Sequence, residues 1–217
     1  MTDKAEMPVA RQATQKTSVV LKDIFTAAQA GKGLDAPRVK EAVTSMTDSV
    51  VRNPDAMMLL AKMKEKSEHS LDRALGVSIY MITFGRYLSL PRAQLDLLGM
   101  LGLLQDVGKV KVPAGLLDKV ETLSDAELEA CKSHVSHSLE ILRATPGLPP
   151  ELPELAALHH ERYDGTGYPR GLRGSQIGLF GGIAGLVDCF DALTQRRPYG
   201  EPMSPSNALD MLYKTRD

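Results

Sequence analysis

Residues 71–109 read LDRALGVSIYMITFGRYLSLPRAQLDLLGMLGLLQDVGK, and this stretch decides the fold class of the chain. Leu75, Ile79 and Ile82 follow one another at spacings of four and three residues, which places them on one face of an α-helix. Pro91 begins a second apolar stretch, because proline is favoured in the first turn of a helix. We therefore predict two successive helices, over about residues 71–88 and from Pro91 up to the sequence QDVGK.

Helical signals also occupy the sequence on both sides of this pair. A helix beginning at Asp35 carries an apolar stripe of Val39, Val43, Met46 and Val50. Prolines or capping side chains that begin further helices are Asn53-Pro54, the capping box Ser124-Asp125-Ala126-Glu127, Pro150 and Ser204-Pro205. The helix from Ser124 is predicted to reach Leu142, the one from Pro150 to end at His159-His160, and another to cover 183–193. No segment alternates with a period of two, so the predicted fold class is all-α.

Composition excludes several functional classes. The chain has 217 residues, a net charge of −1 and no Trp. This charge argues against bulk capture of a nucleic acid polymer or an anionic membrane. No run approaches the roughly 20 apolar residues that a membrane-spanning helix needs. Cys131 and Cys189 lie far apart and form no metal-binding or redox pair, so we expect reduced thiols and a cytoplasmic location.

Three regions are expected along the chain. Residues 1–17 contain no apolar run and are predicted to form a disordered arm. Residues 18–52 are predicted as an N-terminal helical segment that ends its first helix at a Gly-Lys-Gly turn. Residues 53–217 form the main domain, and its last helix runs into Asp217 without a capping residue, which suggests a truncated C-terminal end.

All five histidines, which are His69, His134, His137, His159 and His160, lie in the second helical region of the chain. An adjacent pair, His159-His160, opens the segment HHERYDGTGYPRGL at residues 159–172. A single histidine on an apolar face is usually structural, whereas a pair followed by Glu, Asp and a glycine-rich loop favours a metal site. Neutral imidazoles combined with carboxylates suit first-row divalent metals such as Fe or Mn.

This segment resembles the signature of the HD-GYP family, HHExxDGxGYPxGL, at every fixed position. Three further blocks occur in the family's order: LLQDVGKVKVP resembles LLHDIGKxxIP, KSHVSHSLEIL resembles KxHPxxGxxIL, and VDCFDALTQRRPY resembles VADxYDALTxxRPY. The resemblance covers the chain from about Ser49 to its end. It implies the helical bundle of the HD superfamily, with an extra N-terminal helical segment, and a metal-dependent phosphodiesterase that linearises cyclic di-GMP.

The resemblance also implies roles for individual residues. It implies that the metal ligands are Asp106, His134, His159, His160 and Asp188, with Asp106 bridging the ions. Asp106 and Lys109 would take part in catalysis. Lys109 and Arg197 would contact a ligand phosphate, and Tyr168 would contact the bound nucleotide.

Two family ligand positions have lost their histidine. Gln105 stands where the HD pair has its histidine, and Arg73 stands at the family's first ligand histidine. Guanidinium has no lone pair to donate, and an amide oxygen is a weak ligand. His69, one helical turn before Arg73, is an alternative ligand. The resemblance therefore implies a centre that is incomplete or empty.

Arg73 admits two interpretations. Directed inward, its guanidinium would neutralise Asp106 and Asp188 in place of a metal charge, because two buried carboxylates without a cation repel each other. Directed outward, it would form a surface ion pair. Its place on the ligand helix favours the inward interpretation.

Three functions follow from these residues. The chain binds cyclic di-GMP or a signalling partner with little or no hydrolysis, it is a weak metal-dependent phosphodiesterase, or it docks the GGDEF domains of diguanylate cyclases. The replaced ligands disfavour the second function. The retained Lys109, Arg197 and GYP segment favour the first over the third.

Overall fold

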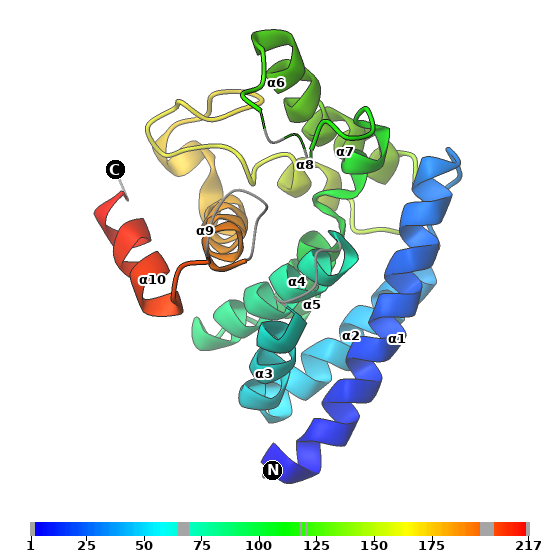
Figure 1. Ribbon diagram of the computed structural model, residues 1–217. Helices are drawn as coiled ribbons and strands as arrows, with labels where there is room; N and C mark the ends of the chain where they lie inside the picture. The colour runs from blue at the N-terminus through cyan, green and yellow to red at the C-terminus, as the bar shows by residue number, and fades with distance from the viewer. Residues whose placement is uncertain (1–2, 65–69, 118, 120, 196–201, 216–217) are drawn as a thin grey trace.

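The computed structural model describes residues 3–64, 70–117, 119, 121–195 and 202–215 (Figure 1). Within these residues the structure is helical and contains no strand, which confirms the predicted all-α class. The α-helices are α1 Asp3–Gln29, α2 Ala36–Arg52, α3 Pro54–Lys64, α4 Ser70–Tyr87, α5 Arg92–Leu104, α6 Asp125–Lys132, α7 His134–Arg143, α8 Leu152–Ala156, α9 Gly178–Thr194 and α10 Pro205–Lys214. Two short 3-10 helices are η1 Val107–Lys111 and η2 Gly174–Gln176.

The predicted pair of helices, α4 and α5, forms the centre of the bundle (Figure 1). Their backbones lie close together at Gly102, where a side chain would not fit. A Cβ atom on this residue would lie 2.5 Å from the Cα of Ser78. The Ser78 hydroxyl also donates a hydrogen bond of 2.8 Å to the carbonyl of Gly99. This packing fixes the beginning of α4, which carries Arg73, relative to the end of α5, which Asp106 follows.

The beginning of the chain differs from the prediction. Residues 3–17, expected to be a disordered arm, belong to α1, whose inner face of Ala10, Ala13, Thr14 and Thr17 is buried. These small side chains form no apolar run, so the hydrophobic pattern gave no signal. Glu6 is fully buried, and its carboxylate accepts hydrogen bonds from Ser49 at 2.7 Å and from Arg52 at 2.8 and 3.0 Å. This compensated charge ties the beginning of α1 to the end of α2.

Most predicted helix starts are confirmed by their caps. Asp35 accepts a hydrogen bond from the amide of Arg38 before α2, and Asn53 accepts one from the amide of Asp55 at the start of α3. Ser204 caps α10, and the capping box of Ser124 with Glu127 begins α6. Because the first orphan amides of a helix need acceptors, such side chains mark helix starts reliably.

Two helix ends were predicted wrongly. The helix from Ser124 does not run unbroken to Leu142, because α6 ends at Lys132 and α7 begins at His134. At the junction, the Ser133 hydroxyl and the His134 ring bond the carbonyls of Ala130 and Cys131, and such local side-chain bonds compete with the helical pattern. The helix predicted to reach His159-His160 is α8, which ends at Ala156 and gives way to tight turns.

No helix in the described ranges is long and apolar enough to cross a membrane. The exposed faces of the bundle are polar around α2 and α7 and more apolar along α10, where Leu209 and Tyr213 are exposed. The buried core runs continuously from α1 through α4 and α5 to α9.

Candidate metal centre

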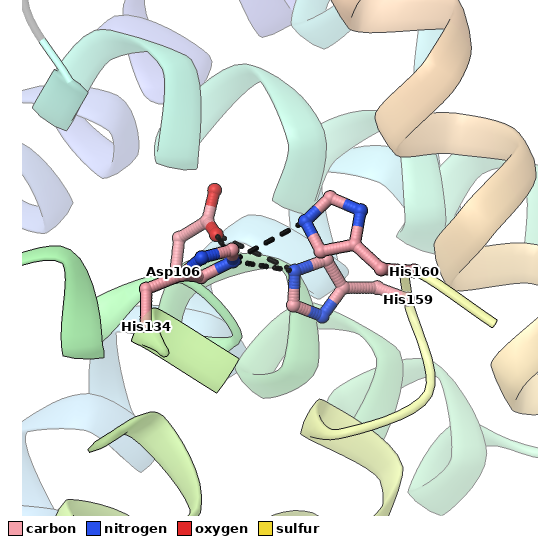
Figure 2. A group of neighbouring side chains, drawn as sticks. All are labelled: Asp106, His134, His159 and His160. Atoms are coloured by element: carbon pink, nitrogen blue, oxygen red, sulfur yellow. Dashed lines mark hydrogen bonds and ion pairs between the residues drawn. The ribbon is translucent and has the colours of Figure 1, made fainter. Parts of the chain in front are cut away.

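Four side chains converge on one point beside the end of α5, as Figure 2 shows. Asp106 follows α5, His134 begins α7, and His159 and His160 lie in the turn after α8. We call these residues the four-donor set. Their donor atoms all lie within 4.8 Å of one another. The Nε2 atom of His134 lies 3.4 Å from that of His159, 3.2 Å from that of His160 and 3.3 Å from Asp106 Oδ1.

The rings of two histidines are oriented from behind by backbone carbonyls. The Nδ1 atom of His134 lies 2.7 Å from the carbonyl oxygen of Cys131, and that of His159 lies 2.6 Å from the carbonyl oxygen of Ala156. A carbonyl only accepts, so each Nδ1 carries the proton and each Nε2 presents a lone pair to the set. Metal-binding histidines are characteristically held in this way by a second partner.

The four-donor set fits a divalent metal. Four donors placed tetrahedrally at a metal–nitrogen distance of 2.0–2.1 Å lie about 3.3 Å apart. Four of the six donor pairs are separated by 3.2–3.4 Å, and all six by no more than 4.8 Å. Asp106 Oδ1 is buried and accepts no hydrogen bond. Burial and the neighbouring His159 lower the pKa of His160 to about 2, so this imidazole is neutral, as a ligand must be.

The second oxygen of Asp106 is bound by an ammonium group. Lys109 Nζ lies 2.6 Å from Asp106 Oδ2. Burial alone would raise the pKa of Asp106, but the ammonium group of Lys109 and the neighbouring imidazoles of His134 and His159 hold that pKa well below its usual range. Asp106 is therefore a carboxylate with one oxygen directed at the imidazoles and one at Lys109.

Arg73 is directed inward and pairs with carboxylates of α9. Its Nη2 atom donates a 2.8 Å hydrogen bond to Asp188 Oδ1, which is the contact the sequence predicted. Its Nε atom lies 3.0 Å from Asp191 Oδ2 as an ion pair that is not aligned as a hydrogen bond. Burial opposes the charge, but Asp188, Asp106 and Asp191 together raise the pKa of Arg73. The guanidinium is therefore a permanent cation between α4 and α9.

Gln105 occupies the other replaced position. Its side chain is buried, and neither amide atom has a hydrogen-bond partner. It lines a cavity of about 20 Å³ together with Arg73, Asp106 and Phe25, which comes from α1. A cavity of this volume is large enough for one water molecule.

The glycine-rich loop is organised by Glu161. Its buried carboxylate accepts hydrogen bonds from the backbone amides of Arg170 at 2.7 Å and Leu172 at 2.9 Å. Tyr168, inside the loop, stacks on His160 with ring centroids 4.7 Å apart and an interplanar angle of 21°. The loop thus places an aromatic ring directly over one member of the four-donor set.

We expect Glu161→Ala to loosen this loop. The change removes the acceptor of two backbone amides, and each buried amide left without a partner costs about 1–3 kcal/mol. Hydrogen exchange followed by mass spectrometry should show faster exchange over residues 162–173. The matched control is Glu151→Ala, an exposed carboxylate before α8, which should leave exchange in the loop unchanged. Unchanged exchange in the Glu161 variant would refute this role.

The structure places the predicted site residues in two groups. Asp106, His134, His159 and His160 meet in the four-donor set, whereas Asp188 pairs with Arg73. Lys109 and Tyr168 border the set. His69 and Arg197 lie outside the described residues, so their assigned roles stay predictions.

Sequence reasoning assigned no role to Asp191 or Glu161. Asp191 lies three residues after Asp188 on α9, so helical spacing was a signal that could have indicated it.

Comparisons with known proteins identify the family to which the chain belongs. A family model described as HD domain matches residues 55–217. The chain is 32% identical over 194 residues to the cyclic di-GMP phosphodiesterase PA4108 of Pseudomonas aeruginosa, covering 89% of this chain and 46% of that protein. It is 35% identical over 147 residues to the 3'3'-cGAMP-specific phosphodiesterase 3 of Vibrio cholerae, covering 68% of this chain and 32% of that protein. The chain therefore spans less than half the length of these relatives.

A solved structure shows the same fold. The HDG"Y"P protein Bd1817 from Bdellovibrio bacteriovorus superposes with a TM-score of 0.69 at 16% sequence identity. The superposition covers 94% of this chain and 65% of that chain.

Proposed function

Because the chain belongs to the HD domain family, as an HD-GYP-type member, we propose that it binds a cyclic dinucleotide, with cyclic di-GMP as the first choice, and hydrolyses it slowly or not at all. The observation that carries the proposal is the ion pair of Arg73 with Asp188. The resemblance assigns both positions to metal binding, and here the carboxylate of Asp188 is instead bound to the guanidinium of Arg73. The dinucleotide comes from the printed names of the relatives, which include cyclic di-GMP and 3'3'-cGAMP phosphodiesterases.

A metal in the four-donor set would act as a Lewis acid on a phosphodiester oxygen and lower the pKa of a bound water. The chain's own residues bind and position the ligand. Lys109 borders the set with its ammonium group partly exposed and offers a charge for a phosphate. Tyr168 offers a ring at the rim, with Lys132 Nζ 5.5 Å from its centroid. Arg197 is proposed as a second phosphate contact from the resemblance.

The direct test combines binding with turnover. Isothermal titration with cyclic di-GMP and with 3'3'-cGAMP should show saturable binding, and chromatography of the same mixtures after hours should show little linear product. If neither nucleotide produced a measurable heat of binding, the proposal would be overturned. Slow but complete hydrolysis that depends on added metal would support the second candidate, a weak phosphodiesterase, which the four-donor set favours. Rapid hydrolysis with stoichiometric metal would contradict the proposal. Docking of GGDEF domains and a cytoplasmic location stay predictions from the sequence.

We expect Lys109→Ala to weaken dinucleotide binding by about 1.5–3 kcal/mol, because a partly buried charge-assisted hydrogen bond to phosphate is lost. Arg197→Ala should have an effect of similar size. Lys111→Ala is the matched control, since Lys111 lies two residues away and is exposed. Titration curves of the Lys109 and Arg197 variants that superimpose on that of the parent would place the nucleotide elsewhere.

A further inference from the structure

We propose that the centre holds a single divalent metal ion, in the four-donor set, and that the Arg73 guanidinium takes the place of a second cation. The inference deepens the proposed function and rests on it for the identity of the site. It concerns the number of ions the chain binds, which is measured without any nucleotide. Failure of dinucleotide binding and failure of this stoichiometry are therefore separate results.

The first step is the division of the Asp106 carboxylate. Its Oδ1 atom lies 3.3 and 3.4 Å from the Nε2 atoms of His134 and His159, and it has no hydrogen-bond donor. Its Oδ2 atom is bound to Lys109 at 2.6 Å. In its two-oxygen bridging mode, a carboxylate gives one oxygen to each of two ions. Here one oxygen is available to an ion in the four-donor set, and an ammonium group holds the other.

The second step is the charge on α9. Asp188 and Asp191 have side chains only 8% and 1% exposed, and two carboxylates so deeply buried require a positive charge nearby. Arg73 supplies it from α4 with both Nη2 and Nε, and its own side chain is 23% exposed. The charge of a guanidinium is delocalised over its three nitrogens, so one arginine can compensate two carboxylates at the same time. Unlike a metal ion, this cation is covalently attached and does not dissociate.

The third step is the lining of the cavity that lies beside Asp106 and Arg73. Besides Arg73, Asp106 and Lys109, it is lined by the neutral amide of Gln105 and by the apolar or small residues Phe25, Ala74, Val77 and Gly102. This lining contains two cations and one carboxylate, and no imidazole. It therefore disfavours a divalent ion electrostatically and offers it one carboxylate that is already paired.

The experiment loads the purified chain with Mn²⁺, removes excess ion by gel filtration and measures manganese by mass spectrometry. We expect one ion per chain in the parent, none in His159→Ala, and two in the double variant Arg73→His with Gln105→His. The double change removes the competing cation, frees Asp188 and supplies two imidazoles. Arg38→Ala, which alters an exposed ion pair on α2, is the control and should hold one ion.

A second measurement uses the parent alone, in case the double variant does not fold. Electron paramagnetic resonance of the Mn²⁺-loaded parent should give the hyperfine spectrum of an isolated ion. A spectrum of two exchange-coupled ions, or two manganese ions per chain, would overturn the inference, as would a parent that retains none. A folded double variant that still takes up only one ion would show that Arg73 does not exclude a second one.

Discussion

Arg73→Ala is expected to lower the free energy of unfolding by about 3–5 kcal/mol, because removing one partner of a buried ion pair leaves the other charge uncompensated. The carboxylates of Asp188 and Asp191 would both lose the contact with Arg73, and both are buried in the face of α9 that packs on α4. Urea denaturation followed by circular dichroism measures the change. The loss exceeds that of a surface ion pair, since little solvent can reach α9 to replace the guanidinium.

The control for this variant is Arg38→Ala. Arg38 pairs with Asp23 at 2.7 Å, but the two side chains are 44% and 54% exposed. Exposed pairs contribute at most about 1 kcal/mol. Equal losses in the two variants would mean that the Arg73 pair is no stronger than a surface contact.

Gly108→Ala is expected to destabilise the chain by about 3 kcal/mol or more and to displace His134. A Cβ atom on Gly108 would lie 2.1 Å from the carbonyl oxygen of His134 and 2.3 Å from the amide nitrogen of Ser138. Both are backbone atoms of α7, so no side-chain rotation relieves the overlap. The Gly108 amide also donates a 2.8 Å hydrogen bond to the Ser138 hydroxyl. Thermal and urea unfolding, together with manganese content, would measure both effects.

Gly182→Ala is the matched control. Gly182 is exposed within α9, and a Cβ atom there would meet nothing within 4 Å. Because alanine is favoured over glycine inside a helix, this change should raise the free energy of unfolding by about 0.5–1 kcal/mol. A Gly108 variant that unfolds at the urea concentration of the parent would show that η1 and α7 separate without cost.

The sequence predicts those parts of the fold whose signals are local. The apolar stripe of α2, the proline before α5 and the serine caps of α6 and α10 each act within a few residues, and all are present. The first half of α1 was not predicted, because its inner face consists of alanines and threonines. The partner that compensates the charge of Glu6 lies 46 residues away on α2. An ion pair between residues so far apart does not change the hydrophobic periodicity of the sequence.

The same distinction applies to the site. The residues of the four-donor set could be named from the resemblance, and the inward direction of Arg73 follows from the charge it replaces. The division of the Asp106 oxygens could not be predicted, because it depends on the tight turn at η1 that brings Lys109 back to Asp106. Likewise, the carbonyls of Cys131 and Ala156 became acceptors only because α6 and α8 end just before His134 and His159.

The ion pair between Arg73 and Asp188 joins residues that lie 115 positions apart, whereas all four donors come from residues 106–160. Closing a longer loop costs more chain entropy, by about 0.6 kcal/mol for each doubling of its length, so we expect distant contacts to form after nearer ones. The two halves of the centre therefore have different kinetic characters. The donor half comes from one continuous stretch, whereas the arginine half requires α9 to pack on α4. We therefore expect loss of the Arg73–Asp188 contact to raise the unfolding rate more than it lowers the folding rate.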